Sequence, residues 1–185
     1  MRPNLLFDFN RYIIVYMKKI LITYYSKWGS TREAAEIIGN VLEKNKFDVA
    51  ILPLPDVRTV QEFDMVIIGA PINGMQWYSS ATAFVLAHRD ELQQKQTALF
   101  CMSYIYFTGS GFWKKAVEKA FAPVLKAITP IKTGIFGGKI DASLPTPMRF
   151  IFGIPADAPL SIFNREDIQK WASDLIRAEQ IRAEL

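Results

Sequence analysis

ILITYYSKWGST, residues 20–31, is a short apolar run that leads into a polar loop with one glycine. The run 20–25 is rich in β-branched and aromatic residues and has the length of a buried strand. From Ser30 to Lys44 the apolar residues recur at spacings of three and four, which is typical of an amphipathic helix. The sequence therefore predicts a strand, a tight loop and a helix in direct succession.

The same alternation of strand and helix continues along the chain. It predicts a parallel sheet with helices on both faces. Five strands fit a three-layer α/β fold with the strand order 2-1-3-4-5. The predicted strands are 20–25, 49–54, 65–70, 97–105 and 132–140, and the predicted helices are 30–44, 79–92, 112–128 and a last helix capped by Asn164.

In this strand order a ligand binds beyond the carboxyl ends of strands 1 and 3. The loops that reach this edge of the sheet are 26–31, 71–78 and 103–111. They are therefore the segments in which we expect the binding site.

The first loop has the chemistry of a phosphate site. Ser26, Ser30 and Thr31 each carry a hydroxyl donor, and the start of the helix offers unpaired backbone N–H groups. Gly29 allows the backbone to curl around an anion without a Cβ clash. The loop lacks both the GxxxxGK[ST] and the GxGxxG patterns, so we expect a phosphate monoester rather than a nucleoside triphosphate or a dinucleotide. The alternative is that Ser30 and Thr31 only cap the helix.

Two stretches of the chain resemble known flavoproteins. Residues 25–31, followed by 34–37, resemble the FMN phosphate loop of flavodoxins, of the form [ST]-x-x-G-x-T, and residues 64–72 resemble their third strand and second flavin loop. Within the flavodoxin-like families the chain most resembles the flavodoxin-domain and menaquinone-dependent protoporphyrinogen oxidase subgroup. The resemblance covers most of 17–175. It departs from those oxidases after the fifth strand, where they carry a basic, aromatic-rich segment and this chain has a Pro-rich insertion, 141–163.

The resemblance implies a flavodoxin-like fold with non-covalent FMN, whose ring is contacted by backbone groups of the second and third loops. Aromatic side chains in these loops suit a flat ring. Trp113 is expected in the core, and the orientation of Trp28 stays open. We see no Ser–His–Asp set, carboxylate pair or metal-ligand cluster, so no catalytic or metal residue is predicted. The predicted cofactor-binding residues are Ser26, Lys27, Trp28, Gly29, Ser30, Thr31, Pro71, Ile72, Asn73, Gly74, Met75, Trp77, Ser103, Tyr104, Tyr106, Phe107, Gly109 and Gly111.

Length, composition and charge limit the domain organisation, location and partners that we expect. The 185 residues suit one domain, which we place at 17–185 after an N-terminal extension, 1–16. A single cysteine makes a reducing cytoplasm the default location. The net charge of +4 favours an anionic membrane surface or an acidic ligand. The sequence has no basic run with interleaved aromatic residues, so we expect no binding to nucleic acid.

Three functions remain open at this point. The first is an FMN-dependent oxidoreductase that passes electrons from a reduced donor to a planar acceptor such as a quinone or porphyrin. The second is an electron carrier between protein partners without its own substrate, and the third is a cofactor-free interaction module. The insertion 141–163 could cap the flavin, touch a membrane, form a homodimer or cover the sheet edge.

Overall fold

The computed structural model describes residues 17–139, 145–151, 154 and 161–183. Its sheet contains five parallel strands in the order β2-β1-β3-β5-β6, with the short strand β4 paired antiparallel to the end of β3. This arrangement confirms the predicted strand order 2-1-3-4-5, because β4 stands apart from the parallel path. The strands are β1 (Lys19–Tyr24), β2 (Asp48–Pro53), β3 (Met65–Asn73), β4 (Gln76–Trp77), β5 (Gln96–Met102) and β6 (Lys132–Phe136).

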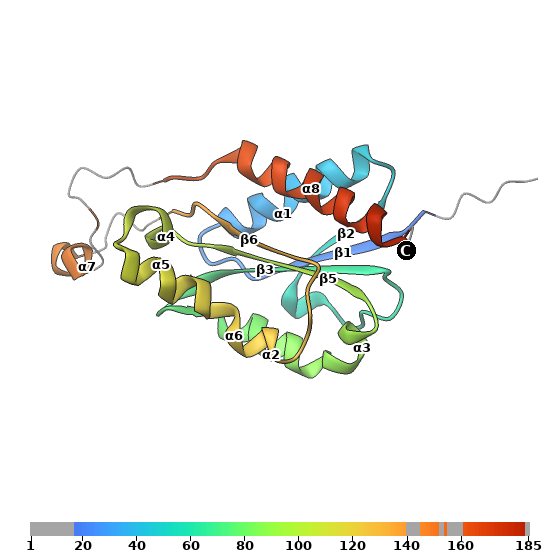
Figure 1. Cartoon of the computed structure of the whole chain (residues 1–185), viewed down its shortest axis with the longest axis horizontal. Helices are drawn as coiled ribbons and strands as arrows, with labels where there is room; N and C mark the ends of the chain where they lie inside the picture. The colour runs from blue at the N-terminus through green and yellow to red at the C-terminus, as the bar shows by residue number, and fades with distance from the viewer. Residues whose placement is uncertain (1–16, 140–144, 152–153, 155–160, 184–185) are drawn as a thin grey trace, which may run out of the picture.

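Helices cover both faces of the sheet, as predicted (Figure 1). One face is covered by α1 (Ser30–Lys44) and α8 (Arg165–Ala183), and the other by α2 (Ser79–Ala87), α5 (Gly111–Glu118) and α6 (Ala122–Leu125). No helix in the described part of the chain is both long enough and apolar enough to cross a membrane. The remaining helices of the described residues are η1 (Leu54–Asp56), α3 (Arg89–Gln93), α4 (Ile105–Thr108), η2 (Lys119–Phe121) and α7 (Thr146–Ile151).

The two faces of the sheet form two hydrophobic cores. Along β1 the side chains of Ile20 and Ile22 enter the core under α1 and α8, whereas Leu21 enters the opposite core. This alternation follows from the two-residue period of a strand. Asn164 caps α8 as predicted, because its Oδ1 accepts hydrogen bonds from the N–H groups of Glu166 and Asp167 at 2.9 and 3.4 Å.

Some predicted elements end or divide differently. The helix predicted at 79–92 breaks at His88 into α2 and α3. The helix predicted at 112–128 is divided into α5, η2 and α6, and Pro123, which cannot donate a backbone hydrogen bond, lies in the first turn of α6. The end of the strand predicted at 97–105 is instead the start of α4.

The chain after β3 also departs from the prediction, because it forms a tight hairpin rather than an open loop. Gly74 and Met75 both have positive φ, 56° and 62°, as the central residues of a type I′ turn do. The turn pairs Trp77 with Ile72 and points the indole inward. The extension 1–16, Ile140 and much of the insertion 141–163 lie outside the described residues.

A close approach between β3 and β5 supports one core. Gly69 on β3 is paired with Phe100 on β5. A Cβ added to Gly69 would lie only 2.0 Å from the ring carbon Cζ of Phe100. Phe100 in turn packs against Phe136 and Trp171, with ring centroids 5.9 and 6.3 Å apart. The absence of a side chain at Gly69 therefore allows α8 to be anchored on the sheet.

We predict that Gly69→Ala lowers the free energy of unfolding by about 1–3 kcal/mol, because the added methyl overpacks the core. Gly111→Ala is the matched control, since nothing lies within 4 Å of its added Cβ. Urea unfolding followed by circular dichroism measures both variants. Equal stability of the two variants would contradict this packing account, whereas partial rescue of Gly69→Ala by Phe100→Leu would support it.

Candidate functional site

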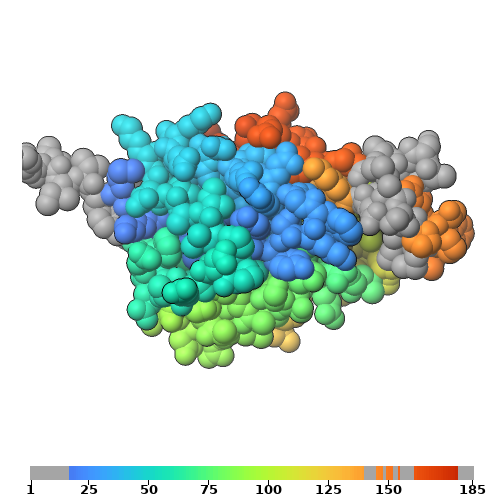
Figure 2. Space-filling view, turned by 180° about the vertical axis from the view of Figure 1, so that it is seen from behind, coloured from blue at the N-terminus to red at the C-terminus, as the bar shows by residue number. Residues whose placement is uncertain are grey.

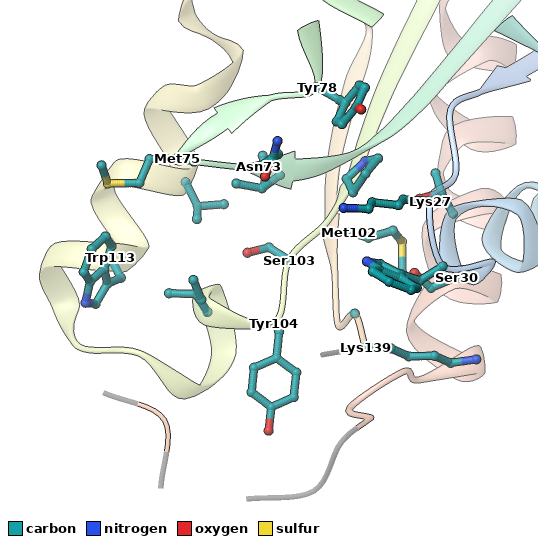
Figure 3. A pocket seen from close by; sticks show the side chains of 18 of the residues that line it. Lys27, Ser30, Asn73, Met75, Tyr78, Met102, Ser103, Tyr104, Trp113 and Lys139 are labelled. Atoms are coloured by element: carbon teal, nitrogen blue, oxygen red, sulfur yellow. The ribbon is translucent and has the colours of Figure 1, made fainter. Parts of the chain in front are cut away.

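A cavity opens at the carboxyl edge of the sheet, where the loops after β1, β3 and β5 meet (Figure 3). Its volume is about 280 Å³, near the lower limit of small-molecule sites. A ligand as large as a mononucleotide would therefore keep part of its surface in solvent. The segment that follows β6 closes one side through Gly138 and Lys139, and Ile154 contributes a buried wall.

One end of the cavity is formed by the amino terminus of α1. Gly29, at the N-cap, is left-handed with φ 86° and makes no side-chain cap, so the first N–H groups of α1 are left for another acceptor. Ser30 and Thr31 lie in the first turn and line the cavity. The Oγ of Ser26 is buried and has no hydrogen-bond partner among the described residues. An oxyanion bound here would supply the acceptor that these donors lack.

Cations surround this end of the cavity, but one carboxylate partly neutralises them. Lys27 and Lys139 both line the cavity (Figure 3). Glu33, in the first turn of α1, lies 3.3 Å from Lys139 Nζ and 3.5 Å from Arg165 Nη2. The Glu33 carboxylate therefore links α1, the segment after β6 and the start of α8, and it holds a negative charge beside the anion site.

The other end of the cavity is apolar. Figure 3 shows Met75 and Trp113 across the cavity from Lys27 and Ser30. Tyr104 is buried, which raises the pKa of its phenol, and the positive charge of Arg149 partly offsets that rise. The cavity thus combines a polar end that suits an anion with an apolar end that suits a flat ring.

A tyrosine pair connects the first two loops. The rings of Tyr25 and Tyr78 are stacked, with centroids 3.9 Å apart and planes inclined by 13°. The backbone N–H of Tyr25 also donates to the carbonyl oxygen of Gly69 at 2.9 Å, which joins the chain after β1 to β3. A hydrogen bond with Tyr78 raises the pKa of Tyr25, and desolvation adds to the rise.

The structure brings most of the predicted binding residues together. Ser26 and Gly29 shape the first loop without lining the cavity itself. The predicted residues that line it are Lys27, Trp28, Ser30, Thr31, Pro71, Ile72, Asn73, Gly74, Met75, Ser103 and Tyr104.

Other predicted residues lie away from the cavity. Trp77 is 2% exposed, and its indole N–H donates to the carbonyl oxygen of Phe100 at 3.3 Å. The hairpin after β3 turns this side chain into the core. The hydroxyl of Tyr106, which does not line the cavity, donates a hydrogen bond to the carboxylate of Glu118. Phe107, Gly109 and Gly111 likewise do not line the cavity.

Sequence reasoning missed several lining residues. Trp113, which was expected in the core, lies on the cavity wall because α5 begins at Gly111, beside the third loop. Gly138 and Lys139 follow β6 at the same sheet edge, so the rule that selected the other loops could also have selected them. The other missed residues are Tyr78, Met102, Ile105, Val117 and Ile154.

We predict that Tyr78→Phe lowers the pKa of Tyr25, because it removes the hydrogen bond that holds the Tyr25 phenol in its neutral form. A spectrophotometric pH titration of tyrosine ionisation should show one transition move to lower pH. Tyr106→Phe is the control, since Tyr106 bonds to Glu118 and not to this pair. An unchanged set of transitions in Tyr78→Phe would contradict the predicted coupling.

Comparison with known proteins identifies the family. Residues 21–146 match the model of the flavodoxin domain family, and the chain belongs to this family. No match was found among curated proteins. The family match supports FMN as the cofactor, as the sequence predicted.

Solved flavodoxins share the fold at low sequence identity. A flavodoxin from the domain Archaea is 17% identical, with a TM-score of 0.54 over 89% of this chain and 99% of its own. Flavodoxin 1 of Bacillus cereus is 15% identical, with a TM-score of 0.55 over 86% and 98%. The Fusobacterium nucleatum flavodoxin, solved with flavin mononucleotide bound, is 14% identical, with a TM-score of 0.54 over 87% and 98%. These likenesses confirm the predicted flavodoxin-like fold.

Proposed function

We propose that this protein binds FMN in the cavity at the carboxyl edge of the sheet and transfers electrons through the flavin. The observation that carries the proposal is the buried Oγ of Ser26, which has no partner among the described residues, beside the uncapped amino terminus of α1. Both features are open to an additional acceptor, and the FMN phosphate is one. The Fusobacterium nucleatum flavodoxin with bound FMN supports the same ligand for this fold.

In this proposal the residues of the first loop hold the phosphate. Ser26, Ser30 and Thr31 donate hydroxyl hydrogen bonds, and the first N–H groups of α1 donate along the helix axis. Lys27 adds a positive charge from the cavity wall. Gly29 keeps the left-handed turn that starts the helix, a conformation that residues with a side chain rarely adopt.

The apolar end of the cavity would receive the flavin ring. Trp113 and Tyr104 offer aromatic surface, and Met75 and Ile72 offer aliphatic walls. Backbone groups of 73–74 and 103–104 lie beside this space and are available to the polar edge of the ring. FMN supplies reversible electron transfer when bound, while these residues orient it and limit its contact with water.

We further propose that the electron acceptor is a planar molecule such as a quinone or porphyrin. Met75 at the cavity is 44% exposed, and exposed aromatic residues lie on the neighbouring helices α4 and α5. Apolar surface beside a redox group suits a flat, apolar acceptor. A carrier that exchanges electrons only with proteins is the second candidate, and the coverage of 98–99% of several small flavodoxins supports it. The two are distinguished by reducing the FMN-loaded protein, removing the excess reductant, and following its reoxidation by a soluble quinone in stopped flow. A rate that saturates with quinone concentration indicates a substrate site, whereas the linear dependence shown by free reduced FMN indicates a carrier.

We predict that Ser30→Ala combined with Thr31→Ala weakens FMN binding at least tenfold, because hydrogen bonds to a charged phosphate are lost. Isothermal titration of the flavin-free protein with FMN measures the change. Ser79→Ala combined with Ser80→Ala is the matched control, since these exposed hydroxyls begin α2 and do not line the cavity. Equal FMN affinity of the two double variants would overturn the phosphate assignment.

Ser26→Ala gives an independent test of the same loop. The substitution removes a buried hydroxyl without a partner, so the flavin-free protein should be as stable as the parent or slightly more stable. FMN affinity should nevertheless fall. A loss of stability without a loss of affinity would show that this hydroxyl is structural.

We predict that Glu33→Gln strengthens FMN binding about two- to fivefold at low salt, the scale of a partly exposed ion pair. The change removes a negative charge beside the phosphate and releases Lys139 and Arg165. Glu36→Gln is the control, because Glu36 lies one turn further along α1 and pairs with Arg32. Weaker FMN binding in Glu33→Gln would show that Glu33 acts mainly by holding the site together.

A further inference from the structure

Large apolar side chains are exposed at the end of the molecule that contains the cavity. Phe150 and Ile151 on α7 are 86% and 57% exposed, and Phe112 at the start of α5 is 69% exposed. None of the three belongs to either hydrophobic core. In Figure 1, α7 and the first turns of α5 occupy the same end of the molecule, and Figure 2 shows α7 in orange, projecting from it. We call these three residues the apolar tip.

Local hydrogen bonds hold the segment 145–154 together. The N–H of Arg149 donates to the carbonyl oxygen of Pro145 at 3.1 Å, and the N–H of Ile154 donates to the carbonyl oxygen of Arg149 at 2.8 Å. Ile154 is buried in the cavity wall, and the charge of Arg149 acts on Tyr104. Phe150 and Ile151 are thus exposed on a segment whose end, at Ile154, packs into the cavity wall.

The part of the sequence that contains the apolar tip carries a net positive charge. Residues 103–163 contain seven Lys and Arg and three Asp and Glu, a difference of four that equals the net charge of the whole chain. Lys114 and Lys115 follow Phe112 on α5, are exposed, and form no ion pair within the described ranges. Glu118, the nearest acidic residue along α5, accepts a hydrogen bond from Tyr106. The apolar tip is thus accompanied by uncompensated cations.

We propose that the apolar tip, together with Lys114 and Lys115, docks the protein on an anionic lipid surface. Phe112, Phe150 and Ile151 would enter the boundary between headgroups and acyl chains, and the lysines would face the headgroups. Inserted apolar side chains and adjacent cations each add to the binding of an anionic lipid surface. The proposal goes beyond FMN binding, because none of these five residues lines the cavity.

A lipid surface fits these residues better than a protein partner does. Lysine is depleted in protein–protein interfaces, whereas lysine beside exposed Phe is typical of interfacial membrane segments. Each lysine near an anionic leaflet strengthens binding about fivefold. Because the apolar tip and the cavity share one end of the molecule, docking would bring the mouth of the cavity to the membrane.

Sedimentation with vesicles tests the proposal on the full, FMN-loaded chain. Vesicles of phosphatidylcholine with about 30% phosphatidylglycerol should bind the protein, and vesicles of phosphatidylcholine alone should bind it much less. Raising the salt from about 0.1 M to about 0.5 M should weaken binding, because the lysines act through screened charge. No binding to the anionic vesicles, or equal binding to both kinds, would overturn the proposal.

Two double variants test whether the apolar tip and the two lysines form the lipid-binding surface. Phe150→Ser with Ile151→Ser should weaken vesicle binding at least tenfold, and Lys114→Ala with Lys115→Ala about 25-fold. Every variant keeps residues 1–16, so any contribution from that segment is common to all. The matched controls are Leu86→Ser with Leu125→Ser and Lys44→Ala with Lys126→Ala, which change exposed residues on other elements.

Control variants that lose binding as strongly as the test variants would overturn the assignment. Analytical ultracentrifugation without vesicles tests whether a second copy of this chain covers the surface instead. A parent protein that does not bind vesicles, and that forms a dimer which Phe150→Ser with Ile151→Ser converts to monomer, would assign the surface to a second copy. Flavin absorbance is read in the same samples. Loss of FMN from the parent with vesicle binding intact would contradict the proposed function and leave this inference standing.

Discussion

The junction between β1 and α1 is the constraint on which the site depends. The N–H of Tyr25 donates to the carbonyl oxygen of Gly69, and the left-handed Gly29 then starts α1 at the carboxyl edge of the sheet. This places the uncapped amino terminus of a 15-residue helix beside the ends of β1 and β3. The partial positive charge of the helix start and its unpaired N–H groups meet in one place, so the fold itself generates an anion site.

The rest of the cavity completes what this junction begins. The hairpin after β3, the loop after β5 and the segment after β6 arrive at the same edge because parallel strands end there together. They provide apolar walls opposite the anion site, and Glu33 connects α1 to the segment after β6 and to α8. A ligand with a phosphate at one end and a flat ring at the other matches this division of the cavity.

Much of this arrangement follows from periodicity along the sequence. The apolar runs of the five parallel strands and the stripe of α1 depend on spacing along the chain, so these elements could be predicted. Their alternation fits the observed strand order. Trp77 could not be placed, because its orientation depends on positive φ at Gly74 and Met75, a turn geometry the residue types allow but do not impose. Trp113 was predicted in the core for a similar reason, because the direction of its side chain depends on the residue at which α5 begins. The exposure of Phe150 also depends on tertiary packing that local pattern does not encode.

In the proposed function the amino terminus of α1 and the first loop bind the phosphate of FMN. The most direct measurement compares the affinities of the flavin-free protein for FMN and for riboflavin, which differ only in that phosphate, by fluorescence titration under identical conditions. We expect FMN to bind at least about 100-fold more tightly, because two or more hydrogen bonds to a charged group have this effect. Equal affinity for the two flavins would contradict it.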